Sequence, residues 1–476
     1  MRSERRGGMG RRLAGGGLLL VLAVSLTGCW DFREPNKVGF IEALGVDRTT
    51  DGHVELSALI AIPSAQVSGG GGGGGGGDSG KRPLLLQTAR GRTLSEALLN
   101  MNRFTSRVLT VSQCRVVVFS EEVARRGLTP YIGLLTRWYE FRSTMVVLIT
   151  EGRASECLRI ESPLERDPVE FFVNLVSMVS PSMGVGSAFQ VQDLLHVMGN
   201  YEGEPVAPLV APYQSGAGPS PGQTSRGTGP EAQASSGSGG KAAVPKNAVQ
   251  FKGLAMFQGS RMVGKLDALA SSYYLMLVGR HQLSFQVVPD PLVRGNYVMV
   301  QAKAIKRDVR VRRVYGRPEL DISLEVPLDL VEVQSTVDYT GRRNRPLLER
   351  AVAEKLGRGC RQVVAQAQRR FRTDIFQFGT FFRVRFLTWP AWVKYDWLHK
   401  QFPRAKINVT VEARLRRPGA TFRPLRPVLA PARPGSAPSE QDQPGQDGDG
   451  GVQHEQAEGA PPVPEAPRPE GVDGRM

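Results

Sequence analysis

The chain has 476 residues, of which 41% are hydrophobic, so it is long enough for two or three domains with apolar cores. Its formal net charge of +16 indicates an anionic partner surface. Four cysteines without a CxxC pair and five scattered histidines exclude the common zinc motifs.

The N-terminus has the features of a lipoprotein signal peptide. Five arginines precede an apolar segment, Leu13 to Leu26, that is too short to span a bilayer. Leu26 supplies a branched apolar side chain, and the small Thr27 and Gly28 let a peptidase close on the backbone. The Cys29 thiol can then take a diacylglycerol. Residues 1–28 are therefore predicted to be removed, and Cys29 to be the lipidated first residue, which could also take an N-acyl chain. The alternative is a plain secretory signal followed by an unrelated cysteine.

The distribution of charge bears on the partner. Residues 436–476 hold nine acidic residues against two arginines, so the basic excess lies in the rest of the chain. A basic body could bind nucleic acid. An exported, lipid-anchored body lies beside an anionic membrane face instead, where each basic residue contributes about 1 kcal/mol. We therefore expect an anionic membrane surface as a partner and no nucleic acid. The alternative is a coding bias that replaces lysine by arginine.

Lipidation of Cys29 leaves three cysteines, Cys114, Cys157 and Cys360. One disulfide and one free thiol would account for them. Each lies in an apolar-periodic segment, however, so buried, unpaired side chains are favoured.

The elements after Cys29 alternate between short strands and helices without a fixed repeat, which indicates an α+β fold with mixed sheets and packed helices. Residues 38–47 and 54–62 are predicted to form a hairpin. The glycine run 69–77 would lose much conformational entropy on ordering and has no side chains whose burial could offset this loss. Residues 68–80 are therefore expected to be a disordered loop. A strand at 84–90 follows it.

Helices and buried strands are predicted next. Thr93 and Glu96 form a capping-box pattern at the beginning of a helix over 93–106. Residues 114–119 and 144–150 each contain a continuous apolar run, as in buried strands. The helical segment between them favours parallel pairing. The remaining helices of this half are expected at 121–138, interrupted by Gly127 and Pro130, at 166–180 and at 190–201.

Residues 214–246 consist largely of Gly, Ser, Pro, Ala and Gln and are predicted to be a flexible linker between two foldable parts. Beyond it, periodicity predicts a hairpin, three long half-exposed strands, the longest helix, two aromatic-rich helical segments and a closing strand. The hairpin is expected at 249–257 with 262–266, and the three strands at 283–288, 297–315 and 321–337. The longest helix is expected at 347–371, the aromatic-rich segments at 376–386 and 389–399, and the closing strand at 406–416. The tail 420–476 is expected to be disordered.

No catalytic motif occurs in a supporting context. No nucleophile elbow, HExxH, P-loop or paired-carboxylate spacing stands in such a context, and isolated pairs such as Glu121-Glu122 are interpreted as caps at a helix start. We therefore expect neither an enzyme nor a cofactor. Trp389, Trp392 and Trp397 could form a sugar-stacking face, but their spacing better suits a helix packed on a sheet.

Several stretches together carry the pattern of a known family. They are Cys29–Glu34, Val38–Asp47, Gly91–Ala97, Phe119–Leu128, Gly253–Phe257, Leu266-Asp267, Thr373–Gly379, Trp397, Phe402-Pro403 and the strand up to Gly419. These residues resemble the Ger(x)C family of spore germination lipoproteins, the C subunits of nutrient germinant receptors. The resemblance covers an N-terminal germination-protein domain, 29–213, and a C-terminal Ger(x)C domain, 247–419.

The resemblance implies a non-enzymatic subunit, lipid-anchored on the outer face of the inner membrane of the spore. It also implies assembly with integral-membrane A and B subunits and a role in the response to nutrients. The chain departs from the family pattern at Gln113, where a histidine is expected, and at Ala268-Leu269-Ala270, which replaces a usually acidic stretch. The alternative is a solute-binding lipoprotein of an ABC importer, which should have two similar lobes joined by hinge strands.

The segment after Cys29 is a candidate contact with the A and B subunits. About eight residues separate Cys29 from the first predicted strand, so this tether spans at most about 28 Å and holds the N-terminal part close to the bilayer. A bare spacer would need neither an aromatic ring nor opposite charges. The candidate contact residues are Trp30, Asp31, Arg33 and Glu34. The alternative is that they pack back on the first hairpin.

Overall fold

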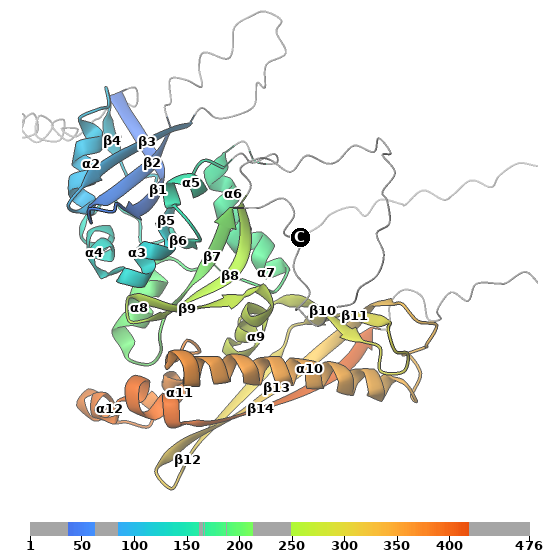
Figure 1. The fold of residues 1–476 in the computed structure, drawn as a ribbon. Coiled ribbons are helices and arrows are strands. Elements are labelled where there is room, and N and C mark those ends of the chain that lie inside the picture. Colours follow the sequence, from blue (N-terminus) through green and yellow to red (C-terminus); the bar gives the residue numbers. More distant parts are fainter. Residues whose placement is uncertain are drawn as a thin grey trace, which may run out of the picture. The chain divides into compact units, whose positions relative to one another are not determined.

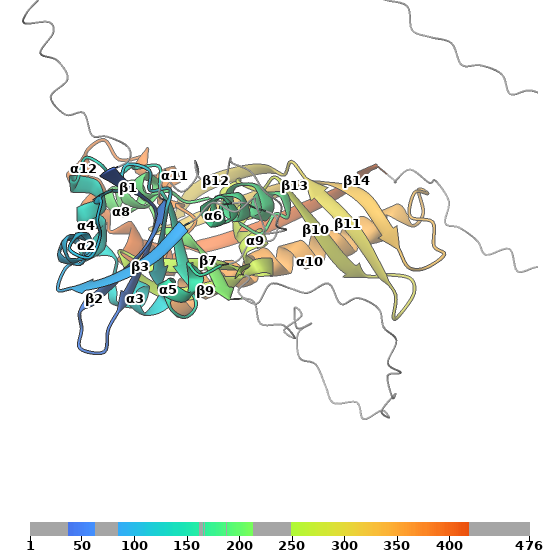
Figure 2. The same ribbon diagram turned by 90° about the horizontal axis from the view of Figure 1, so that it is seen from above.

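The computed structural model describes residues 37–61, 84–160, 165, 167–186, 188–212 and 249–417. These residues form a nine-stranded and a five-stranded sheet, with helices packed against both (Figures 1 and 2). This confirms the predicted α+β class with mixed sheets. The predicted signal peptide, glycine loop, linker and tail lie outside the described residues.

The larger sheet has a parallel centre flanked by antiparallel hairpins. Its strands are β1 (Val38–Arg48), β2 (Val54–Ala61), β3 (Leu84–Gly91), β4 (Val108–Thr110), β5 (Val116–Ser120), β6 (Val146–Thr150), β7 (Val206–Pro212), β8 (Val249–Gln258) and β9 (Arg261–Asp267). Their order is β3-β2-β1-β5-β6-β7-β8-β9, and β4 pairs with the beginning of β1. β1, β5, β6 and β7 are parallel, which confirms the predicted pairing of β5 with β6.

Both faces of this sheet are covered, because its central strands are apolar on both sides. In β5, Val117 and Phe119 face one core while Val116 and Val118 face the other. The first core is closed by α2 (Leu94–Asn102), α3 (Glu121–Arg126), α4 (Thr129–Arg137) and α8 (Val191–Asn200). The second is closed by α5 (Ala154–Cys157) and α6 (Pro168–Asn174), which continues through η3 (Leu175–Val179) into α7 (Ser180–Ser182).

The capping box at the beginning of α2 is only half formed. The Thr93 hydroxyl accepts a hydrogen bond from the Glu96 amide at 3.1 Å, as predicted. The Glu96 carboxylate, however, accepts from the amide of Arg92, at 2.7 Å, and not from that of Thr93. The helix ends at Asn102, four residues earlier than predicted, and the chain turns there into β4.

The predicted linker connects two neighbouring strands. Pro212, at the end of β7, and Val249, at the beginning of β8, are register partners in an antiparallel pair. β8 and β9, which the sequence grouped with the second half, therefore complete the nine-stranded sheet. The predicted glycine loop likewise separates two paired strands in the sequence, since Ala61 and Leu84 are register partners in the β2–β3 pair. The domain boundaries themselves stay a sequence-based prediction.

The second sheet consists of β10 (Leu283–Pro289), β11 (Tyr297–Lys303), β12 (Lys306–Val314), β13 (Arg317–Val333) and β14 (Lys406–Arg417). β13 is its longest strand and pairs with β11 and β12 along one edge and with β14, in parallel, along the other. Its buried face packs on α9 (Ala268–Val278) and on α10 (Arg345–Ala365), which continues as η4 (Gln366–Phe371). Figure 1 shows α10 running along this sheet.

β8 is shared between the cores of the two sheets. Ala255 and Phe257 belong to the core of the nine-stranded sheet, whereas Leu254 and Met256 belong to that of the five-stranded sheet. The alternation of a single strand thus joins the two halves, because its successive side chains point to opposite faces.

Three sequence-based expectations need correction. Residues 297–315 were expected to be one strand, but they form β11 and β12, separated at Ala304 with a φ of 44°. The adjacent apolar residues Ala304 and Ile305 interrupt the alternation after Lys303, and this interruption marks the turn in the sequence. β7 was not predicted, because it contains two prolines. α9 was not predicted either, because it is apolar on nearly all sides and lacks a helical period.

The last helices lie between α10 and β14. They are α11 (Gly379–Arg383), α12 (Trp389–Tyr395), η5 (Trp397–Gln401) and η6 (Phe402–Arg404). Trp392 and Trp397 are buried in the second core, so the packing interpretation of the tryptophans is confirmed for these two. Within the described ranges, no helix has the length and apolar character needed to cross a membrane.

Candidate functional site

The residues that the sequence singled out as the functional site lie outside the described part of the chain. They are the signal-peptidase motif Leu26, Thr27 and Gly28, the lipidation residue Cys29, and the candidate contact residues Trp30, Asp31, Arg33 and Glu34. The first described residue, Lys37, directly precedes β1. Lipidation and partner contact at this end therefore stay predictions.

Four segments converge where the two sheets meet, around Asp374. We call this group of residues, Glu204, Phe257, Thr373, Asp374 and Trp397, the carboxylate junction. The Glu204 amide donates to the Asp374 carbonyl at 2.7 Å, and the Thr373 hydroxyl donates to the Phe257 carbonyl at 2.6 Å. These two bonds connect the stretch after η4 to both β7 and β8, so the junction joins the halves of the molecule.

The Asp374 carboxylate is fully buried and is held by three N–H donors. Phe376 donates its amide at 3.1 Å, Gly379 donates its amide at 3.1 Å, and Trp397 donates its indole Nε1 at 2.7 Å. Burial raises the pKa of Asp374 to about 7, although the three hydrogen bonds lower it. The three donors are neutral N–H groups, so they do not offset the effect of burial, and Asp374 keeps its proton to a higher pH than an exposed aspartate does.

A second carboxyl group lies at the same junction. Glu204 accepts a hydrogen bond from the Gly259 amide, in the β8–β9 turn, at 2.7 Å. Burial raises the pKa of Glu204 to about 7 as well. The backbones approach closely here, because a Cβ at Gly379 would overlap the carbonyl of Glu202. Both carboxyl groups are buried, and their hydrogen bonds connect segments that are distant in the chain, so both hold the junction together.

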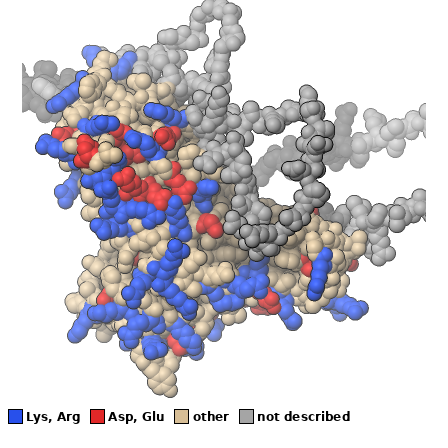
Figure 3. Space-filling view, viewed as in Figure 1, with Lys and Arg blue, Asp and Glu red and all other residues tan. Residues whose placement is uncertain are grey.

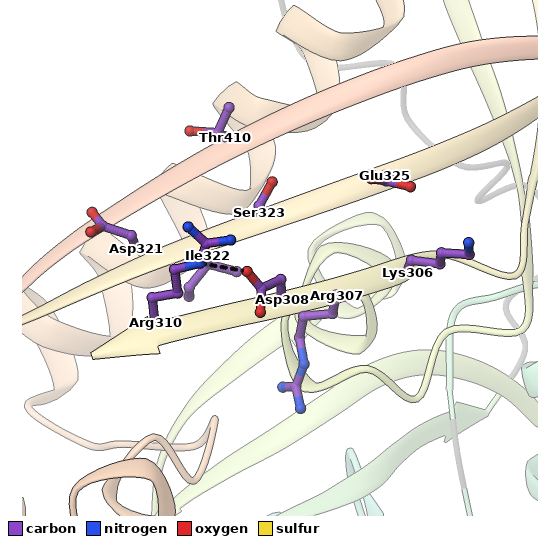
Figure 4. Close-up of a pocket in the computed structure, with 9 residues that line it drawn as sticks. All are labelled: Lys306, Arg307, Asp308, Arg310, Asp321, Ile322, Ser323, Glu325 and Thr410. Atoms are coloured by element: carbon purple, nitrogen blue, oxygen red, sulfur yellow. Dashed lines mark hydrogen bonds and ion pairs between the residues drawn. The ribbon is translucent and has the colours of Figure 1, made fainter. Parts of the chain in front are cut away.

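The exposed face of the second sheet forms a shallow groove of about 500 Å³. Figure 4 shows its lining side chains on β12, β13 and β14. Its carboxylates are partly matched by nearby donors: Asp308 accepts from Arg310 at 2.9 Å, and Asp321 accepts from Asn408 at 2.7 Å. The lining residues are Lys306, Arg307, Asp308, Arg310, Asp321, Ile322, Ser323, Glu325 and Thr410.

The groove lacks the character of a small-molecule site. Such sites are concave, largely apolar and enclose most of the ligand. This groove is open and lined mainly by charged and polar groups, so it fits a macromolecular contact better than a solute. Sequence reasoning did not single it out, although the alternation of charged residues along β12 marks an exposed strand face.

The two departures from the family pattern lie on the surface or at a helix end. The Gln113 side chain accepts a hydrogen bond from Arg142 at 3.2 Å. Ala268-Leu269-Ala270 forms the first turn of α9, where Asp267 caps the helix by accepting from the Ala270 amide at 2.7 Å. Replacing acidic residues there removes a favourable interaction with the helix dipole but leaves the cap.

The three cysteines are unpaired and buried, as predicted. Burial raises the pKa of each thiol, Cys114, Cys157 and Cys360, to about 12, so they are protonated and unreactive at neutral pH. Among the residues that the structure describes, no group of three or more His, Cys, Asp or Glu side chains could hold a metal ion.

Comparisons with known proteins agree with this arrangement. A family model described as "Spore germination protein N-terminal domain" matches residues 31–212, and one described as "Spore germination B3/ GerAC like, C-terminal" matches residues 252–419. The second match begins within β8, so the boundary between the two families cuts through the nine-stranded sheet.

The sequence identity to individual relatives is low. The chain is 24% identical over 413 residues to "Spore germination protein KC" of Bacillus subtilis (strain 168), which covers 86% of this chain and 96% of that protein. It is 20% identical over 359 residues to "Spore germination protein B3" of the same organism, covering 75% and 85%. A solved structure titled "Crystal Structure of the GerBC protein" matches with a TM-score of 0.47 and 15% identity, covering 78% of this chain and 96% of that one.

Proposed function

Because the chain belongs to the Ger(x)C family of spore germination proteins, we propose that it is a lipid-anchored, non-catalytic subunit of a nutrient germinant receptor in the spore. The observation that carries this proposal is the pair of family matches, which together span almost all described residues. The buried carboxyl groups and the open groove support a scaffold that binds other proteins and performs no reaction.

Deletion of the gene tests the role in the nutrient response. Spores without the protein should germinate slowly or not at all with nutrients, and normally with a trigger that bypasses nutrient receptors. The measurement is the loss of optical density of a spore suspension. An unchanged nutrient response, or an equal loss with both triggers, contradicts the proposal.

The anchor is proposed to be a diacylglycerol on Cys29, because two acyl chains hold a protein stably at a membrane where one chain does not. Cys29→Ala should move the protein from the membrane to the soluble fraction and reduce nutrient germination. The matched control is Ser25→Ala, which changes the same segment but keeps Leu26 to Cys29 intact. A Cys29→Ala protein that stays fully membrane-bound argues against a lipid anchor.

The partners are proposed to be integral-membrane A and B subunits, contacted by the segment Trp30–Glu34. Replacing Trp30 and Asp31 by serine, with Cys29 kept, should lower the amount of both subunits that co-purifies with the protein. Asn36→Ser is the control, because it changes the same tether without removing an aromatic ring or a charge. Normal co-purification and normal germination of the double variant would refute contact at this segment.

The importer alternative receives no support from the described residues. A solute-binding lipoprotein closes two similar lobes around its ligand. The described residues instead form a nine-stranded mixed sheet and a five-stranded sheet of different topology, and β8 of the larger sheet contributes side chains to both cores.

A further inference from the structure

Two segments of the second half lie side by side. They are the end of β12, which leads into the β12–β13 turn, and the stretch from the end of α11 through α12. The Arg385 guanidinium donates to the Val311 carbonyl of β12 at 2.7 Å. Arg313, also on β12, lies over the ring of Tyr395 at 4.8 Å from its centroid. These contacts hold β12 beside the connection between α11 and α12 and beside the end of α12.

The tip of the β12–β13 turn displays an aromatic side chain without a packing role. Val314 and Arg317 are register partners, so Tyr315 and Gly316 alone make the turn. Both have positive φ, 47° for Tyr315 and 77° for Gly316, a conformation that favours Gly, Asn or Asp. Tyr315 is 102% exposed, so no contact within the protein compensates the unfavourable backbone. The side chain is therefore suited to an external contact.

The neighbouring connection displays aliphatic side chains in the same manner. Leu387 is 103% exposed and Val384 is 81% exposed. Trp389 is partly exposed at the beginning of α12, where the Arg383 guanidinium lies over its ring at 5.4 Å. Single exposed apolar residues are ordinary on a protein surface, but three large ones lie within six residues here. Arg313 of β12, two residues before Tyr315, lies over the Phe386 ring of the same stretch at 5.7 Å from its centroid, so β12 and this apolar stretch belong to one surface.

The same surface is basic. The stretch 309–317 contains four arginines and 379–395 contains two arginines and one lysine, and neither contains an acidic residue. Figure 3 shows acidic side chains gathered over the nine-stranded sheet, whereas basic and uncharged side chains predominate around β12 and α12. Within the described part of the chain, five cations of this surface form no ion pair with an acidic side chain: Arg313, Arg317, Arg383, Arg385 and Lys394. Arg383 and Arg385 each donate to a backbone carbonyl, that of Phe386 at 2.8 Å and that of Val311 at 2.7 Å.

We propose that this basic–apolar surface, Tyr315, Val384, Leu387 and Trp389 with the five cations named above, docks on a bilayer that contains anionic lipid. Leu387, Val384 and Tyr315 enter the interfacial region, and the cations bind headgroup phosphates. A protein partner would meet a flatter, contiguous apolar core. Here the apolar side chains protrude singly, among cations that form no ion pair with an acidic side chain of the described residues. This combination matches the polarity and charge of a membrane interface.

This contact is independent of the proposed lipid anchor, and the experiment keeps the two apart. The full chain carries Cys29→Ala in every arm, so no acyl chain contributes. Binding is measured by sedimentation with vesicles of phosphatidylcholine and with vesicles containing one third phosphatidylglycerol. The protein should bind the anionic vesicles and not the neutral ones, and added salt should release it.

Two pairs of substitutions separate the apolar and basic parts. Val384→Ser with Leu387→Ser should lower binding to anionic vesicles at least tenfold. Arg317→Gln with Lys394→Gln should lower it about 25-fold, since each cation near the surface contributes about fivefold. The matched control is Arg342→Gln with Arg350→Gln, two exposed arginines outside the surface, which should lose far less.

The opposite results overturn the proposal. They are no binding to anionic vesicles, equal binding to both vesicle types, or an equal loss in the control pair. A variant that binds vesicles normally but no longer co-purifies with receptor proteins from spores also overturns it, because the surface then serves a protein partner. Unchanged circular dichroism and thermal midpoints exclude unfolding as the cause of a loss.

Discussion

The hydrogen bond from Trp397 to Asp374 should contribute measurably to stability, and a second buried tryptophan isolates its contribution. Trp397→Phe removes the Nε1 donor, 2.7 Å from the carboxylate, but keeps an aromatic ring where the indole stacks on Phe382 at 4.7 Å. Trp392 is equally buried, yet its Nε1 is recorded without a hydrogen-bond partner among the described residues. Trp392→Phe therefore removes a similar volume without breaking a hydrogen bond.

The difference between the two variants estimates the energy of that bond. A hydrogen bond to a charged group contributes about 1.5–3 kcal/mol, whereas removal of an unsatisfied buried donor costs nothing beyond packing. About 1 kcal/mol shifts the thermal midpoint by roughly 2–4 °C in a domain of this size range. Trp397→Phe should therefore melt at least about 3 °C below Trp392→Phe at pH 8, where Asp374 is charged.

The difference in thermal midpoint between the two variants should be smaller at pH 5. Because the pKa of Asp374 is raised to about 7, the group is protonated there, and a hydrogen bond between neutral groups contributes only about 0.5–1.5 kcal/mol. Differential scanning fluorimetry at both pH values is sufficient. Equal midpoints for the two variants, or a gap that does not change between pH 5 and pH 8, would refute this account of the junction.

Three further outcomes are expected. The raised pKa values of Asp374 and Glu204 mean that the folded state retains protons that the unfolded chain has lost, so stability should fall as the pH rises from about 4 to about 7. In thermal scans, the double variant Asp374→Asn with Glu204→Gln should show a smaller dependence of the midpoint on pH. Replacing 213–248 by a four-residue turn should stabilise the protein by up to about 2 kcal/mol, because β7 and β8 are already paired and a shorter loop costs less closure entropy. A thermal midpoint lowered by more than about 5 °C would show that the segment packs. Gly253→Ala should lower the midpoint by several degrees, because its φ is 141° and a Cβ would overlap the backbone of β9, whereas Gly133→Ala in α4, with open space around it, should leave it unchanged or raise it.

Sequence patterns were sufficient where the physical cause is local. The buried strands β5 and β6 are continuous apolar runs, and α10 follows from a long helical period, so each was predicted within a few residues. The lipobox pattern is local too, since a peptidase and an acyl transferase recognise a short stretch and not a fold, but it lies outside the described residues and stays a prediction. The segment Thr373–Gly379 was singled out by resemblance alone, because no pattern in the sequence distinguishes a buried aspartate from an exposed one.

By itself, the sequence determined the fold class, most of the elements, the packing of the cysteines and the family. Only the tertiary structure decided that β8 and β9 complete the first sheet, that α9 is a helix, and that Asp374 is buried at the junction. Any strand edge offers the same backbone donors and acceptors, so its neighbour depends on long-range register. A helix that is buried on all sides shows no helical periodicity of apolar residues in its sequence. The ionisation of Asp374 depends on four segments, distant in the chain, that exclude water from one carboxylate.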